Sequence, residues 1–134
     1  HPKFIARLQN SDRLALTDPP QTQKKRRLED YIQNAYSTGD ITESVSLSAQ
    51  SIFQRLCEIP DLSFPDASYA GGFLLFFWDN GTHHFEIEIE PDQTVYYFYE
   101  NRTTGEIWSK EDKGEVSFDQ SVLAKLKLVA LPGA

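Results

Sequence analysis

Methionine is absent from this chain of 134 residues, and cysteine occurs once, as Cys57. A single cysteine supplies neither a disulfide framework nor a cysteine-rich metal site. We therefore interpret Cys57 as a small apolar packing residue in a reducing compartment. The sequence begins His1-Pro2 without a starting methionine, and we expect the natural start to lie upstream.

Long apolar runs are also absent. No stretch approaches the length of a membrane span, and the first residues lack the charged-then-apolar layout of a signal peptide. We therefore expect a soluble, cytoplasmic protein with no membrane partner. The sequence has no nucleophile elbow, phosphate-binding glycine loop, HExxH or CxxC motif. For that reason we expect no catalytic residues, no cofactor and no metal, and an unrecognised enzyme is kept as the second alternative.

The formal net charge of -7 is unevenly distributed along the chain. Residues 1–36 carry seven Lys/Arg against four Asp/Glu, whereas the remainder carries six against sixteen. This balance argues against direct nucleic-acid binding, which normally requires a basic face, but it leaves a basic or protein partner open. A basic run is usually a solvated helix face, yet cations at a helix start oppose its dipole, so the run here is also a candidate docking patch for an acidic partner or phosphates. It consists of Lys24, Lys25, Arg26 and Arg27.

Hydrophobic patterning predicts a single globular α+β domain over residues 1–134, with residues 1–19 as a candidate flexible N-terminal segment. The spacing of apolar residues predicts a first helix over Pro20–Ser37. A second helix is expected to begin at a cap, either Ser44 or Ser46, and to stop before a proline.

The period then changes to that of strands, and the predicted architecture is two N-terminal helices, a four-stranded antiparallel β-meander and a C-terminal helix. The last helix is expected to open with Ser117 in capping-box spacing. The four predicted strands read FLLFFW, THHFEIEIE, TVYYFYE and GEIWSK.

The segment FFWDNGTHHFEIEIE contains the strongest short-range signal in the chain. Asn80-Gly81 tolerates the positive φ of a tight turn, which predicts a hairpin. Alternation on the second strand places His83 with the apolar residues and His84 with the glutamates. The two histidines should therefore point apart and cannot converge on one metal ion.

Three glutamates alternate along the same strand, and two interpretations of them stay open. A solvated sheet face needs a polar residue at every second position. Alternatively, carboxylates spaced by about 6.6 Å imitate successive phosphates of a nucleic-acid strand. This acidic ladder consists of Glu86, Glu88 and Glu90.

Aromatic and apolar residues lie on both faces of the predicted sheet. The helices of the chain can cover one face, and the surplus on the second face indicates a contact with another protein or a homodimer. The candidate partner-binding residues are Tyr96, Phe98 and Trp108.

A set of local features runs from about Ser46 to Glu106: a helix ending near a proline, a Gly-Gly entry into a strand that ends in Trp, an alternating Glu-Ile strand, a Pro-Asp turn, and an aromatic strand. They correspond to Gly71-Gly72, Trp78, Glu86-Ile87-Glu88-Ile89, Pro91-Asp92 and Tyr96 to Tyr99. In these features the chain resembles a widespread group of small uncharacterised bacterial α+β proteins, and departs from the pattern at Gln93. The resemblance implies the fold and a bacterial origin, and the group has no established activity to carry over.

These observations favour a non-catalytic protein-binding module, of antitoxin-, immunity- or adaptor-like type, that uses a sheet face and an acidic surface. The alternative is an acidic phosphate or DNA mimic that inhibits a nucleic-acid-binding protein through the acidic ladder.

Overall fold

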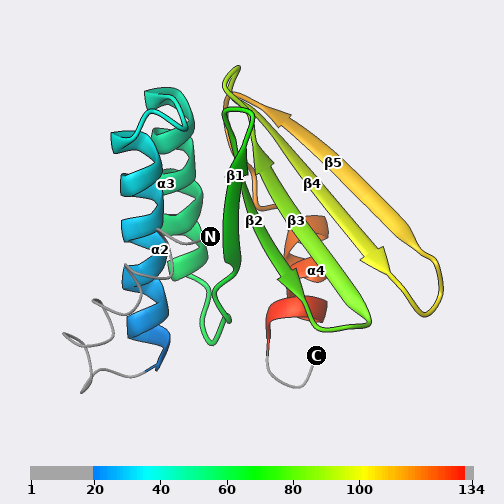
Figure 1. Ribbon diagram of the computed structural model, residues 1–134. Helices are drawn as coiled ribbons and strands as arrows, with labels where there is room; N and C mark the ends of the chain where they lie inside the picture. The colour runs from blue at the N-terminus through cyan, green and yellow to red at the C-terminus, as the bar shows by residue number, and fades with distance from the viewer. Residues whose placement is uncertain (1–19, 132–134) are drawn as a thin grey trace.

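The computed structural model describes residues 20–131, so the expectation for residues 1–19 lies outside the described residues. The chain folds into three helices and five strands (Figure 1). In chain order these are α2 (Pro20–Ser37), α3 (Glu43–Cys57), β1 (Asp66–Ala70), β2 (Phe73–Asp79), β3 (His83–Ile89), β4 (Thr94–Asn101), β5 (Ile107–Lys113) and α4 (Gln120–Ala130).

The α+β class and the antiparallel meander are confirmed, but the sheet has five strands in the order β1-β2-β3-β4-β5 rather than four. The additional strand is β1, with the sequence DASYA. It contains no β-branched residue and a single aromatic, so its local preference for a strand is weak. Its conformation comes from antiparallel pairing with β2, in which Tyr69 lies opposite Leu74.

The first helix has the predicted bounds, whereas the predicted caps of the other two helices were wrong. Thr42 caps α3 by accepting a hydrogen bond from the Val45 amide. Asp119 caps α4 by accepting one from the Val122 amide. In each case the residue directly before the helix is the cap, whereas Ser44 and Ser46 lie within α3 and Ser117 lies upstream of the Asp119 cap.

All three helices cover the same face of the sheet. In Figure 1, α2 and α3 lie side by side next to β1, and α4 lies behind the sheet. The residues that face the helices alternate along each strand, and nearly all of those on β2, β3 and β4 are buried. The strand part of this core is Leu74, Phe76, Trp78, Phe85, Ile87, Ile89, Val95, Tyr97 and Tyr99.

We call the helix-packed side of the sheet the covered face and the other side the open face. The hairpin register fixes which residues share the open face, because Phe77 pairs with Glu86 and Leu75 pairs with Glu88. On the next strand Phe98 and Tyr96 continue these two rows. None of the helices in residues 20–131 is long and apolar enough to cross a membrane.

Candidate docking face of the sheet

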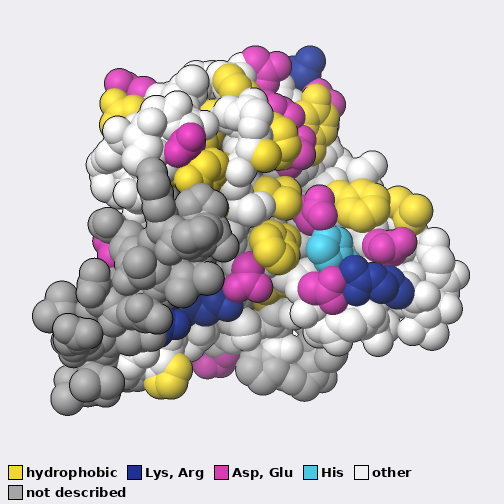
Figure 2. All heavy atoms as spheres, in the orientation of Figure 1, with side chains coloured by type: hydrophobic (Ala, Val, Ile, Leu, Met, Phe, Trp, Pro, Cys, Tyr) yellow, Lys and Arg dark blue, Asp and Glu magenta, His cyan; other side chains and the backbone are white. Residues whose placement is uncertain are grey.

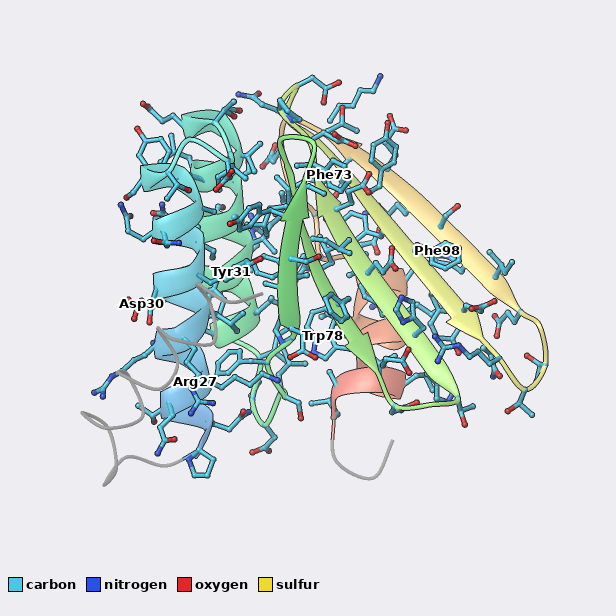
Figure 3. All side chains as sticks on the ribbon, in the orientation of Figure 1. Arg27, Asp30, Tyr31, Phe73, Trp78 and Phe98 are labelled. Carbon is cyan, nitrogen blue, oxygen red and sulfur yellow. The ribbon has the colours of Figure 1, made fainter. Side chains whose placement is uncertain are left out.

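The open face carries its side chains in columns that follow the strands. An apolar column on β2 and an aromatic column on β4 flank an acidic column on β3. Figure 2 shows hydrophobic side chains beside acidic ones and a histidine over this part of the molecule, and Figure 3 labels Phe73 and Phe98 from the two flanking columns. The apolar column is Phe73, Leu75 and Phe77, the acidic column is Glu86 and Glu88 together with Glu90 directly after β3, and the aromatic column is Tyr96 and Phe98.

The two faces of the sheet differ sharply in exposure. On the covered face Leu74 and Phe76 are completely buried, whereas Tyr96 on the open face is 41% exposed and Ile107 on β5 is 63% exposed. The three side chains of the apolar column and Phe98 remain partly exposed. The described part of the chain places no helix over this side, so its apolar groups are in contact with solvent.

Glu88 lies in the middle of the acidic column and has an unusual environment. It pairs with Leu75 on one side and with Tyr96 on the other. Burial among these neighbours raises the pKa of Glu88 to about 7, and the hydrogen bond and negative charge of Glu90 and the charge of Glu86 act in the same direction. At neutral pH the acidic column therefore carries less than its full negative charge.

A polar cluster closes the end of the open face at the hairpin turn. Arg102 donates two hydrogen bonds to the Asp79 carboxylate, at 2.8 and 2.6 Å, and joins the turn after β4 to the turn after β2. The ring of His84 lies between Asp79, at 3.0 Å from Nδ1, and Glu86, at 2.7 Å from Nε2. The hydrogen bonds from Arg102 and from the Gly81 amide hold the pKa of Asp79 well below its usual range. The members of the cluster satisfy one another, and we interpret it as a structural clip.

The two histidines point to opposite faces, as predicted. His83 lies on the covered side, where Nδ1 is 2.7 Å from the Tyr99 hydroxyl and the two rings stack with centroids 5.8 Å apart. His84 lies on the open side in the polar cluster. Within residues 20–131 no group of three or more His, Cys, Asp or Glu side chains could hold a metal ion.

The structure separates the predicted aromatic partner-binding residues into two places, one on each face of the sheet. Tyr96 and Phe98 share the open face with the acidic column, which is the acidic ladder predicted from the sequence. Trp108 pairs with Tyr99 and therefore lies on the covered face, where its ring stacks on Phe85 with centroids 6.3 Å apart. Trp108 is half-buried and packs against the core, so it cannot contribute to the same surface as Tyr96.

The basic run lies in the first two turns of α2 and does not form one patch. Successive residues of an α-helix are rotated by about 100°, so four in a row spread around most of the helix circumference. Lys24 forms an ion pair with Asp66 at 3.6 Å, and Arg27 donates to the Gln23 side chain at 3.5 Å. The remaining two, Lys25 and Arg26, are exposed.

Sequence reasoning did not include the apolar column of β2 among the site residues. A usable signal existed, because the Asn80-Gly81 turn fixes the register that pairs Leu75 with Glu88. Ile107 on β5 was also missed. Its face depends on the register across the β4–β5 turn, for which the sequence has no comparably strong signal.

Comparison of the chain with protein-family models, with curated proteins and with solved structures found no match. The site is therefore interpreted from its own geometry.

Proposed function

We propose that the protein is a non-catalytic, cytoplasmic protein-binding module, of antitoxin-, immunity- or adaptor-like type, and that it docks its partner on the open face of the sheet. The observation that carries this proposal is the pair of partly exposed columns on β2 and β4, which lie on the side of the sheet opposite all three helices. Exposed apolar side chains gathered on one face beside polar residues are typical of contact surfaces.

The arrangement of the carboxylates on the open face supports binding rather than catalysis. Three carboxylates share one open surface, and one of them, Glu88, has a raised pKa because of its neighbours. General acid–base chemistry on this face would need a second group held in a contrasting environment beside it, together with a pocket that excludes water. The carboxylates here stand instead between apolar side chains, an arrangement suited to a broad contact.

A phosphate mimic is the second candidate function, and the regular spacing of the acidic column favours it. The raised pKa of Glu88 counts against it, because a mimic depends on full negative charge at neutral pH. The dependence of affinity on ionic strength distinguishes the two functions. A complex formed by carboxylates alone should weaken steeply as ionic strength rises, whereas a complex that also buries the apolar columns should keep most of its affinity.

The decisive experiment replaces open-face side chains while preserving strand preference. The full chain serves as bait in a lysate of the source organism, and a captured protein is identified, purified and measured again as a pair. Leu75→Thr combined with Tyr96→Thr should abolish that interaction and leave the circular dichroism spectrum and the thermal melt nearly unchanged. Sedimentation of the same variant tests whether the partner is a second copy.

Two controls define the surface. Leu47→Ala removes an apolar side chain that is 57% exposed on α3, far from the open face in sequence and on another element, and it should bind normally. Trp108→Ala removes a half-buried ring on the covered face. It should lower the thermal stability, while the protein that remains folded still binds the partner. Full binding by the Leu75 and Tyr96 double variant would overturn the proposed docking face.

A further inference from the structure

We propose that the segment docking on the open face is apolar and cationic, with a Lys or Arg of the partner protein placed between the two flanking columns to pair with the acidic column. This inference rests on the proposed function and adds the chemical class of the partner. The row Leu75–Glu88–Tyr96 is its centre. It offers an aliphatic side chain, a carboxylate and an aromatic ring on neighbouring strands.

Such a row matches the three parts of a long cationic side chain. The methylene stem of Lys or Arg packs on apolar groups, its charged head pairs with a carboxylate, and the same head is attracted to the face of an aromatic ring. Directly opposed side chains on adjacent strands have Cβ atoms about 4.5–5.5 Å apart, so one cation can reach both the ring and the carboxylate of a row.

The covered face already uses this combination with lysines of the chain itself. Lys125 Nζ lies 4.6 Å from the centroid of the Tyr99 ring and 3.3 Å from the Glu106 carboxylate. Lys110 Nζ lies 5.4 Å from the Tyr97 ring and 3.3 Å from the Asp112 carboxylate. Both lysines belong to elements at the rim of the core. The same pairing of ring, carboxylate and cation is therefore stable in this fold.

On the open face Arg102 is engaged at the hairpin end with Asp79 and Glu100, away from the middle of the acidic column. Within residues 20–131, Glu88 and Glu90 form no ion pair with any Lys or Arg, and Glu86 pairs with His84. On the edge strand β5, Lys113 pairs with Glu111. Glu88 and Glu90 hydrogen-bond to each other, so a cation from outside the described residues could pair with both carboxylates.

The protonation of Glu88 supports the same conclusion. Apolar neighbours and the adjacent carboxylates raise its pKa to about 7. A cation placed beside Glu88 would favour the ionised form, so binding near neutral pH should release protons. An uncharged apolar partner would bury the carboxyl group further and take protons up.

A second copy of this chain fits the open face less well. Face-to-face packing about a two-fold axis near β3, the central strand, would set the acidic column of one copy against the acidic column of the other. Like charges brought together in a contact oppose association. The charge pattern therefore favours a different protein with the opposite sign.

The test uses random peptides displayed on phage and selected against the full chain. We expect the peptides that compete for the open face to be enriched in Lys or Arg among apolar residues. The combined variant Glu86→Gln, Glu88→Gln, Glu90→Gln should bind a selected synthetic peptide with an affinity lower by roughly tenfold or more. This is the loss expected when charge-assisted hydrogen bonds are removed. Calorimetry near pH 7 in two buffers of different ionisation enthalpy should show proton release.

The matched control changes the same net charge elsewhere, by Glu29→Gln, Glu58→Gln and Glu115→Gln, all exposed residues outside the sheet, and it should keep full affinity. Selected peptides that lose binding in the Leu75→Thr, Tyr96→Thr variant but not in the triple glutamine variant would overturn the cationic inference and leave the docking face intact. Peptides that keep binding in both variants would overturn the docking face itself. Failure to select any peptide that competes for the open face would overturn the inference that a peptide segment docks there.

Discussion

Glu88 lies on the open face, and its titration makes the stability of the fold depend on pH. Its folded pKa of about 7 lies above the ordinary value of 4.5, so the folded state holds this proton more tightly than the unfolded chain. The stabilisation is fully present below pH 4.5 and is lost as the pH rises through about 7. Because the group is only partly buried, solvent screens part of the effect.

We predict that Glu88→Gln flattens this pH dependence. The melting temperature of the variant should exceed that of the original chain by a few degrees at about pH 8, and the difference should shrink towards about pH 4. Thermal melts across this range provide the measurement, and Glu115→Gln in the loop after β5 is the control. An equal shift at both ends of the range would show that Glu88 acts through packing rather than through titration.

Tyr97 and Tyr96 are adjacent residues with opposite surroundings. Tyr97 is buried and its hydroxyl donates to the Asp112 carboxylate at 2.9 Å. Burial, together with this hydrogen bond and the charge of Asp112, raises the pKa of Tyr97. Tyr96 projects from the open face.

We predict that Tyr97→Phe lowers the free energy of unfolding by about 1–2 kcal/mol, because the partly buried Asp112 carboxylate loses a donor. Tyr96→Phe should change it by less than about 0.5 kcal/mol, as for an ordinary surface substitution. Urea denaturation of both variants provides the comparison. Equal costs for the two would contradict the assignment of Tyr97 to the covered face.

At the scale of single elements, the cap of α3 offers a clean comparison. The Thr42 hydroxyl accepts from the Val45 amide at 3.2 Å, whereas the Ser44 hydroxyl is buried without a hydrogen-bond partner. We predict that Thr42→Ala lowers the free energy of unfolding by about 1 kcal/mol. Thr42→Ser should keep most of the stability, because serine also caps helices well. Ser44→Ala should be neutral or stabilising. Denaturant midpoints would contradict this if Ser44→Ala proved the more costly change.

The elements that could be predicted from sequence are those with strong local signals. Apolar spacing located α2, and Asn80-Gly81 located the β2–β3 hairpin, whose Gly81 has a φ of +95°. The alternation along β3 then placed the glutamates on one face, which is the centre of the candidate site.

What the sequence could not show depends on contacts between distant segments. β1 is held by pairing with β2 and by the ring of Tyr31, 5.3 Å from that of Tyr69, and no local pattern encodes these contacts. The face occupied by Trp108 depends on the register of β5 against β4, which is set by the turn between them. A single-residue slip there would have placed Trp108 beside Phe98 instead.

At the scale of the whole molecule, the fold is expected to be independent of metal. Two side chains of the types that bind metals, Asp79 and His84, are engaged with each other and with Arg102. We predict that a thermal melt with excess chelator coincides with the untreated one, because removal of a bound metal would otherwise subtract its binding free energy. A fall of several degrees would contradict this prediction.

The strand order also has a consequence for how the chain folds. Each strand pairs with its neighbour in sequence, so the sheet can close hairpin by hairpin through short loops, at a low entropic cost for each closure. The long-range closure comes from α4, where the Ala130 carbonyl accepts from the Ser63 amide at 2.8 Å and the Leu128 carbonyl from the Asn80 side chain at 3.2 Å. Because α4 leaves the ribosome after the five strands, it completes a core whose sheet can already be assembled, and a nascent chain paused before Gln120 would still expose part of its covered face.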